Sequence, residues 1–578
     1  MVGGQDWQAS GPAARRVAEG THTGASGMER FFREHWLGAL RAAVIGVLGL
    51  AILAGLFLPI YTDEIGWRFQ ERAGFDGVDK MFSELCGPNS LARPAFFMWP
   101  ARIYSALFNG LFPAPIWVRL SGILYALVFG ALALKLIRRL TADAGDRLTI
   151  PAVGAGLMAL GTMPMLTVWS RPEQPVVIAI VLALLVAVAD LPDMTRPTPA
   201  RTAWLRSAGI AALAAVATSY HLKGLFAAPL LLVCLYFASR GRAANLPRLV
   251  AGGFIIVVIA LSFAYWKDRL ACPGNAALAA EYARNSMGAK ISGVRSLDEA
   301  RTALGLMIGQ LSVFDYVTLV TPREYPLSNW LEPRQVTEGG SFRWFLVIVA
   351  GWALGLILGC VAVLGGLWRS WQARRLDARV ALAVMLVVTL LGWSTTQLIR
   401  NVYEATFAIP VLMLAVIVAL SLRPFEWLRP IYNIAASLIG IAGIASPIAL
   451  FVVFGPSLAR ANAQSGVIAV QQGSTSVWNY GQVRRDVLAA AKACNIPEPA
   501  RARAVVVDDL SYFPYMRSTL PQHMLGVLGG WNGEITDPLA YLRDRQSSGI
   551  LVECRFVWPQ LRGQMKQVGR ICCMGPIK

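Results

Sequence analysis

Long runs of apolar residues, separated by short polar connections, fill most of the chain up to about residue 455. Because roughly 20 consecutive apolar residues make a helix long enough to cross a bilayer, these runs predict about eleven transmembrane helices. The first run starts too late and is too long for a cleaved signal peptide, so we expect it to be retained. The predicted spans are 38–60, 116–137, 150–168, 174–190, 207–220, 223–238, 249–266, 342–367, 380–398, 405–421 and 432–455.

Basic residues gather in alternate connections between these spans. Five short connections each have more Lys and Arg than Asp and Glu, which is typical of cytoplasmic loops. The chain is therefore expected to be a multi-pass protein of the cytoplasmic (inner) membrane, with its N-terminal tail, residues 1–37, inside. The basic groups are Lys135, Arg138, Arg139, Arg147, Arg196, Arg201, Arg206, Arg240, Arg242, Arg248, Arg369, Arg374, Arg375, Arg379, Arg423 and Arg429.

The outer side receives most of the remaining chain. It has long loops at 61–115 and 267–341 and a C-terminal segment, 456–578, in which helical and strand-like stretches alternate. We expect a helix over Asp486–Cys494 and strands at Ala504–Val507, Gly549–Val552 and Val568–Cys572. The sequence thus predicts an α-helical polytopic membrane domain, 38–455, followed by a small extracytoplasmic α/β domain, 456–578.

Composition agrees with this organisation. Hydrophobic residues make up 56% of the chain and charged residues only 15%, against about 25% charged in soluble proteins, so a purely soluble protein is excluded. The formal net charge of +19 would suggest a nucleic-acid partner in a soluble protein. Here the cytoplasmic loops account for most of it, so we expect the lipid bilayer, and no nucleic acid, as a partner.

The cysteines fit the same topology. Cys234 and Cys360 fall within spans and are expected to be small core residues. Six others fall on the outer side, where disulfides can form, and they allow fifteen pairings. The adjacent Cys572 and Cys573, together with Cys494 and Cys554, indicate a disulfide-stapled terminal domain; a zinc site is the alternative, without the usual ligand spacing. The six are Cys86, Cys272, Cys494, Cys554, Cys572 and Cys573.

Ionisable residues stand at the outer ends of the spans in four places. Charges beside a bilayer are costly and are usually paired or functional, so their shared side indicates a site at the membrane surface. Each also has a simpler explanation: a helix stop, an ion pair within one turn, a snorkelling lysine or an interfacial anchor. The four places contain Asp63 and Glu64; Arg171 and Glu173; His221 and Lys223; and Arg400 and Tyr403.

A carboxylate facing basic groups at this surface suits one kind of chemistry. Lys and Arg side chains bind phosphate or pyrophosphate through charge-assisted hydrogen bonds. A carboxylate can remove the proton of an acceptor hydroxyl as it attacks the anomeric carbon of a sugar. Because nucleotide-activated donors are normally absent outside the cytoplasmic membrane, such a site would use a sugar carried on a lipid phosphate.

Several short motifs, in order, resemble the integral-membrane GT-C glycosyltransferases. Asp63-Glu64 after the first span, Arg93 to Trp99, and Trp117 to Leu120 opening the second span are similar to the branch of protein O-mannosyltransferases and the aminoarabinose transferase of lipid A. Later turns of that branch resemble Trp169–Glu173, His221–Leu225 and Tyr403–Pro410. The resemblance covers approximately residues 39–421, about two thirds of the chain.

The resemblance implies a GT-C-like fold, a polyprenyl-phosphate-linked sugar donor and a catalytic Asp in the first outer loop. Asp63 and Glu64 are the expected catalytic residues. By position Asp63 would be the base, and Glu64 would turn toward a basic group or the acceptor, because successive helix positions diverge by about 100°. Arg93 would replace the Lys that contacts phosphate in the family, and its segment lacks the second Pro. The other expected phosphate-binding residues are His221, Lys223, Arg400 and Tyr403, and Arg119, Arg171 and Glu173 are expected to be structural or secondary.

The acceptor remains open between a glycan, lipid A and a protein. No cofactor is expected with certainty, and a divalent metal is possible, although the outer acids show no metal-ligand spacing. Two other functions compete. A transporter or flippase would place charges near the bilayer midplane and often shows inverted repeats, neither of which is found here. A non-catalytic envelope-polysaccharide assembly protein would tolerate Asp63→Asn, whereas an enzyme using this base would not.

Overall fold

The computed structural model describes most of the chain, and all structural statements below refer to this part. The described residues are 35–58, 60, 64, 114–141, 146–161, 163–191, 197–221, 223–270, 276, 298, 340–395, 405–422, 426–463, 475–508, 510–518, 537–554 and 557–577.

Each of the eleven predicted apolar runs contains helix in the structure. The third run is divided into two helices, α8 and α9, and the sixth into α12 and α13; the others each contain one main helix. The helices are α3 (Leu37–Ala54), α7 (Pro115–Leu140), α8 (Asp146–Ala159), α9 (Met163–Leu166), α10 (Glu173–Ala187), α11 (Ala200–Tyr220), α12 (Lys223–Phe226), α13 (Ala228–Ala238), α14 (Asn245–Leu270), α21 (Gly340–Gln372), α22 (Ala378–Thr395), α23 (Ala405–Leu420) and α24 (Arg429–Ala463).

Length and composition distinguish two groups among these helices. Within the described part of the chain, segments of α3, α7, α14, α21 and α24 are long and apolar enough to cross a membrane. The apolar parts of α10, α13, α22 and α23 are shorter, between 10 and 17 residues. The protein is thus a mostly helical protein with several membrane-spanning candidates, and the number of eleven crossings stays a prediction.

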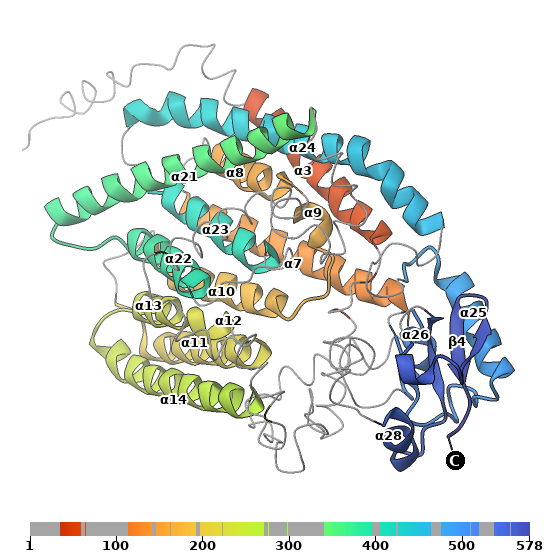
Figure 1. Ribbon diagram of the computed structural model, residues 1–578. Helices are drawn as coiled ribbons and strands as arrows, with labels where there is room; N and C mark the ends of the chain where they lie inside the picture. Colours follow the sequence, from red (N-terminus) through yellow and green to blue (C-terminus); the bar gives the residue numbers. More distant parts are fainter. Residues whose placement is uncertain are drawn as a thin grey trace, which may run out of the picture.

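The helical body has a buried centre and an apolar outer surface. Figure 1 shows α10 and α23 inside the body and α14 and α24 along its margins. From Thr406 to Leu422 every side chain of α23 and its end is buried. By contrast, α3, α7, α14, α21 and α24 expose large apolar side chains, as helices facing lipid do; examples are Leu50, Leu127, Leu249, Leu364 and Val452.

The C-terminal segment forms a small α/β unit around a four-stranded sheet. Its elements are α25 (Tyr480–Ala493), β1 (Val506–Val507), α26 (Tyr512–Tyr515), α28 (Pro538–Asp544), β2 (Ile550–Glu553), β3 (Lys566–Val568) and β4 (Ile571–Met574). The strand order is β1-β2-β4-β3, with β1 and β2 parallel and the other pairs antiparallel. The single strand predicted over Val568–Cys572 is wrong, because Gly569, at φ +60°, turns the chain and makes β3 and β4 a hairpin.

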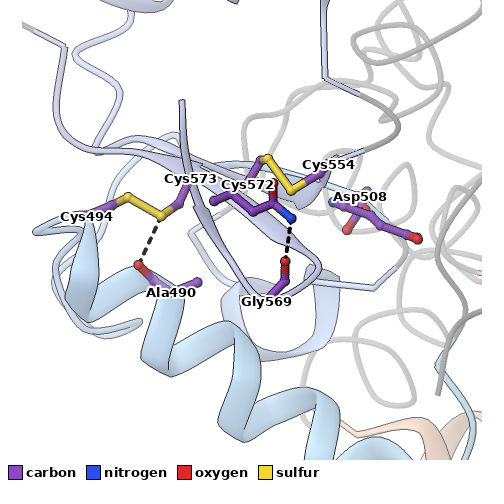
Figure 2. The surroundings of a disulfide bond; sticks show 9 residues. Ala490, Cys494, Asp508, Cys554, Gly569, Cys572 and Cys573 are labelled. Carbon is purple, nitrogen blue, oxygen red and sulfur yellow. Dashed lines mark hydrogen bonds between the residues drawn. A yellow bond between two sulfur atoms is a disulfide. The ribbon is translucent and has the colours of Figure 1, made fainter. Parts of the chain in front are cut away.

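Two disulfides lie on opposite faces of this sheet. Successive strand residues point to opposite faces, so the adjacent Cys572 and Cys573 point in opposite directions. Cys573 is bonded to Cys494 at the end of α25, and Cys572 is bonded to Cys554 after β2 on the other face (Figure 2). The expected disulfide-stapled domain is therefore found. Cys86 and Cys272 lie outside the described residues.

The two cysteines within the helical body behave differently. Cys234 on α13 is buried, as expected for a small core residue. Cys360 on α21 is exposed, so the expectation that it is a core residue was wrong. The physical reason is that α21 lies at the edge of the helical body, with one side facing the surroundings of the protein.

The sheet domain packs directly on the C-terminal end of α3 and the first turn of α7. Ile60 and Val118 belong to the same apolar cluster as the inner face of α25 and the sheet. The amide of Ile60 donates to the carbonyl of Thr475 at 2.8 Å, and the rings of Phe57 and Trp478 stack with centroids 4.8 Å apart. This contact places the domain beside Glu64, the first polar residue described after α3.

Candidate functional site

Glu64 and Arg119 form a fully buried ion pair where α3 and α7 meet. Glu64 Oε1 lies 2.6 Å from Arg119 Nη1, and both side chains have 0% exposure. Arg119 comes one turn after the start of α7, where Pro115 sits in the first turn and favours helix initiation. Its Nη2 also donates to the carbonyl of Leu58 at 3.2 Å. The guanidinium thus ties the end of the first helical segment to α7.

The turn before α10 joins this ion pair. The amide of Ser170 donates to Glu64 Oε1 at 2.7 Å, and Gln174 holds the same turn by donating to the carbonyls of Thr167 and Trp169. Gly122 on α7 makes this approach possible: a Cβ there would lie 2.1 Å from the carbonyl oxygen of Val168. Because no real Cβ tolerates that contact, only glycine fits at this position.

A second buried network begins at Arg171, the residue after Ser170. Glu173, the first residue of α10, accepts from Arg171 Nη2 at 3.2 Å and from Lys223 Nζ at 2.8 Å. A carboxylate in the first turn also suits the positive end of the helix dipole. Glu173 has 0% exposure and Lys223 has 1%. Two cations therefore share one carboxylate in a site closed to water.

Aromatic side chains from α22 and α23 cover the Lys223 ammonium. Nζ lies 5.6 Å from the ring centroid of Trp393 and 5.9 Å from that of Phe407, within the range of cation–π attraction. The amide of Lys223 also donates to His221 Nδ1 at 3.1 Å, which fixes the imidazole of a partly exposed residue. The ends of α22 and α23 therefore reach the same place as the turns before α10 and α12.

The structure brings together six of the residues singled out from the sequence. Three of the four outer polar clusters contribute, because the Ser170–Arg171 turn links the Glu64–Arg119 pair to the Glu173 network. The predicted pairing of Arg171 with Glu173 within one turn is present. The six are Glu64, Arg119, Arg171, Glu173, His221 and Lys223. Asp63, Arg93, Arg400 and Tyr403 lie outside the described residues.

The burial of the network bears on the expected tasks of two members. Glu64 is the carboxylate turned to a basic group, as one of the Asp63–Glu64 pair was expected to be, and it is enclosed. Lys223 was expected to line a pocket for a lipid phosphate, yet its ammonium is on Glu173 and under two rings. Contact of Lys223 with a phosphate stays a prediction, and the geometry shown is that of a positioning residue.

Sequence reasoning overlooked the residues that enclose the network. Trp393, Phe407 and Gln174 read as ordinary members of apolar runs. A glutamine directly after Glu173 at the head of an apolar helix was the available signal, since a buried amide needs backbone partners. For Trp393 and Phe407, which flank the connection 396–404, the sequence offered no comparable sign of a buried polar network.

Metal ligands do not gather at this site in the part of the chain that the structure describes. No group of three or more His, Cys, Asp or Glu side chains there is arranged to hold a metal ion. A divalent metal therefore stays a prediction from the sequence.

Comparisons with known proteins give one structural likeness. No protein-family model and no curated protein matches this chain. Among solved structures, it is similar to the oligosaccharyltransferase of Archaeoglobus fulgidus in the apo form, with 12% sequence identity and a TM-score of 0.40. That similarity covers 92% of this chain and 70% of the other. At this level it describes neither a donor nor an acceptor for this protein.

Proposed function

We propose that this protein is a membrane glycosyltransferase that moves a sugar from a polyprenyl-phosphate carrier to an acceptor at the outer face of the cytoplasmic membrane. The observation that carries the proposal is the bond from the Ser170 amide to Glu64 Oε1. Through it, the residue that follows Asp63 is fixed beside the Arg171–Glu173–Lys223 network. Asp63, the proposed base, directly precedes Glu64 in the sequence, which supports a common site with the cations of this network.

In this proposal the two neighbouring carboxylates have different tasks. Glu64 is held by Arg119 and Ser170 and fixes the start of the loop. Asp63 acts as general base: it takes the proton of the acceptor hydroxyl while that oxygen bonds to the anomeric carbon. The bond from this carbon to the phosphate oxygen breaks with its electron pair, the polyprenyl phosphate leaves, and the configuration is inverted.

Cationic groups support the departing phosphate. Arg93, Arg400 and Tyr403 are the proposed direct contacts, since guanidinium groups and hydroxyls bind phosphate oxygens. Lys223 and Arg171 are proposed to act from beneath, by fixing the turns that carry His221 and Ser170. The C-terminal domain, which packs on the C-terminal end of α3 and the first turn of α7, is proposed to meet the acceptor.

A deletion strain tests the function as a whole. If the proposal holds, mass spectrometry of its lipid extract will show one polyprenyl-phosphate sugar accumulating while one sugar residue disappears from a surface glycan, lipid A or protein. The purified protein in liposomes should then consume that accumulated carrier-linked sugar. A normal pool of carrier-linked sugars with shortened surface glycans would instead indicate an assembly protein. Accumulation without consumption in liposomes would indicate a flippase.

A further inference from the structure

An apolar groove runs between α3 and α7 on the outside of the helical body. Both helices pack on α8 but make little contact with each other, which leaves an open groove of about 150 Å³ between them. Its lining includes Ile45, Leu48, Phe129, Leu134, Met158 and Met413.

The groove is open to the surroundings of the protein and is almost entirely apolar. Ile45 is 43% exposed and Leu134 is 40% exposed, so the rim lies on the outer surface of the helices. Thr167 supplies a polar side chain, and its hydroxyl donates to the carbonyl of Met163 at 2.8 Å. Such a wall suits a hydrocarbon chain rather than a polar ligand.

A basic hollow continues the groove at one end. It has a volume of about 480 Å³ and shares Leu134, Ile137 and Pro151 with the apolar groove. Its other lining residues are Arg41 near the start of α3, Arg138 near the end of α7 and Arg147 at the start of α8. Three cations from three helices therefore meet where the hydrocarbon-lined groove ends.

These arginines have no carboxylate partner among the described residues. No salt bridge in the described part of the chain includes them, and the lining of the hollow contains no acidic side chain. Arg41 Nη1 donates only a long bond, 3.4 Å, to the carbonyl of Arg147. The fork of an arginine matches a phosphate, and basic hollows between membrane helices bind lipid headgroups.

We propose that this combined groove binds an anionic diacyl phospholipid, with its phosphate on Arg41, Arg138 and Arg147 and an acyl chain between α3 and α7. The complementarity of three cations to one anionic headgroup, and its continuity with a hydrocarbon-lined groove, identify the occupant. The site lies at the opposite ends of α3 and α7 from the Glu64–Arg119 pair. On the topology expected from the loop charges, this is the cytoplasmic leaflet, whose surface is anionic. The site is independent of the proposed glycosyl transfer.

Native mass spectrometry of the purified full-length protein in detergent tests the headgroup. Dioleoyl phosphatidylglycerol should bind more tightly than dioleoyl phosphatidylcholine. The double variant Arg138→Gln/Arg147→Gln should weaken phosphatidylglycerol binding by about tenfold or more, the size expected for two basic groups at a lipid headgroup. Lys135→Gln is the matched control, because Lys135 is exposed on the same helix and does not line the hollow.

A glycine variant tests the hydrocarbon part. Gly130 lines the groove, and a Cβ there meets nothing within 4 Å, so Gly130→Leu should fold normally and fill the groove. It should weaken phosphatidylglycerol binding, whereas Gly46→Leu should not, because Gly46 also has nothing within 4 Å but lies outside the lining. Thermal unfolding of each variant confirms that the fold is retained.

Any one of four results would overturn the proposal. Equal binding of phosphatidylcholine and phosphatidylglycerol would show that the site does not select an anionic headgroup. Equal weakening by Lys135→Gln and by the double arginine variant would show an effect of overall charge alone. Unchanged binding in Gly130→Leu, or displacement of the lipid by millimolar inorganic phosphate, would reduce the site to a phosphate-binding surface without a lipid chain.

Discussion

Glu64 and Arg119 are 55 positions apart in sequence and form a contact of 2.6 Å with no exposure of either side chain. Breaking a buried pair by removing one partner costs about 3–5 kcal/mol, because a charge is left without compensation. Arg119→Met should therefore lower the thermal stability strongly. Adding Glu64→Gln should restore part of the stability, since a neutral amide then replaces the buried carboxylate that has lost its partner.

Thermal unfolding in detergent, followed by tryptophan fluorescence, checks this pair. The double variant is expected to melt above Arg119→Met. If the two substitutions simply add, the pair contributes no coupling and the start of the first outer loop is not fixed by it.

Gly122 offers a test of the close approach between α7 and the turn before α10. Gly122→Ala would place a Cβ 2.1 Å from the carbonyl oxygen of Val168, so the turn that carries Ser170 must shift. Gly130→Ala on the same helix meets nothing within 4 Å and should be neutral or gain the roughly 1 kcal/mol by which alanine favours a helix. The melting temperature should fall in Gly122→Ala and should stay the same or rise in Gly130→Ala, and equal behaviour would contradict the described packing.

The two disulfides of the terminal domain should differ in their effect on stability. Cys494–Cys573 closes a loop of sequence separation 79 and Cys554–Cys572 one of 18. Loop-closure entropy then gives about 4.5 and 3 kcal/mol respectively. Replacing each pair by alanine should lower the melting temperature of the domain, more for the first pair. Cys360→Ala is the control, because Cys360 is exposed and outside any disulfide; a larger loss from the short loop would reverse the expected order.

Asp508, directly after β1, gives the terminal domain a pH dependence. Burial raises the pKa of this carboxyl above its ordinary value, against the hydrogen bonds that it accepts from Ser511, Leu510 and the amide of Glu553. As pH rises above the ordinary Asp value, the unfolded chain loses this proton first, so stability falls by up to about 1.4 kcal/mol per pH unit until the folded pKa is passed. Below the ordinary Asp value both the folded and the unfolded chain hold this proton, so the stability does not change with pH through Asp508.

Hydrogen exchange of peptides covering β1 and β2 measures this effect in the full chain. The protection lost between pH 4 and 7, corrected for the intrinsic pH dependence of exchange, should be larger in the wild type than in Asp508→Asn, which does not titrate. The stability advantage of the wild type over the variant should therefore narrow as pH rises. An advantage that widens with pH would mean that the folded pKa is lowered instead.

Sequence patterns predicted the helices well and the site only in outline. Apolar runs of membrane length locate α3, α7 or α24 because hydrocarbon contact requires them. The division of β3 from β4 was missed, since Gly569 lies inside a run that otherwise alternates like one strand. Polar residues at span ends pointed to one surface. Their pairing could not be predicted, because Glu64 and Ser170, or Glu173 and Lys223, meet only through helix packing.

If Asp63 is the base of glycosyl transfer, its loss should be seen most directly with the carrier-linked sugar that accumulates in a deletion strain. The purified Asp63→Asn protein, in liposomes with this substrate and acceptor, is expected to transfer the sugar 10²–10⁴-fold more slowly than the wild type, as typical of a lost general base, while keeping its melting temperature. Glu64→Gln should instead lower the melting temperature and cost less in transfer. Wild-type transfer rates in a folded Asp63→Asn protein would contradict the account.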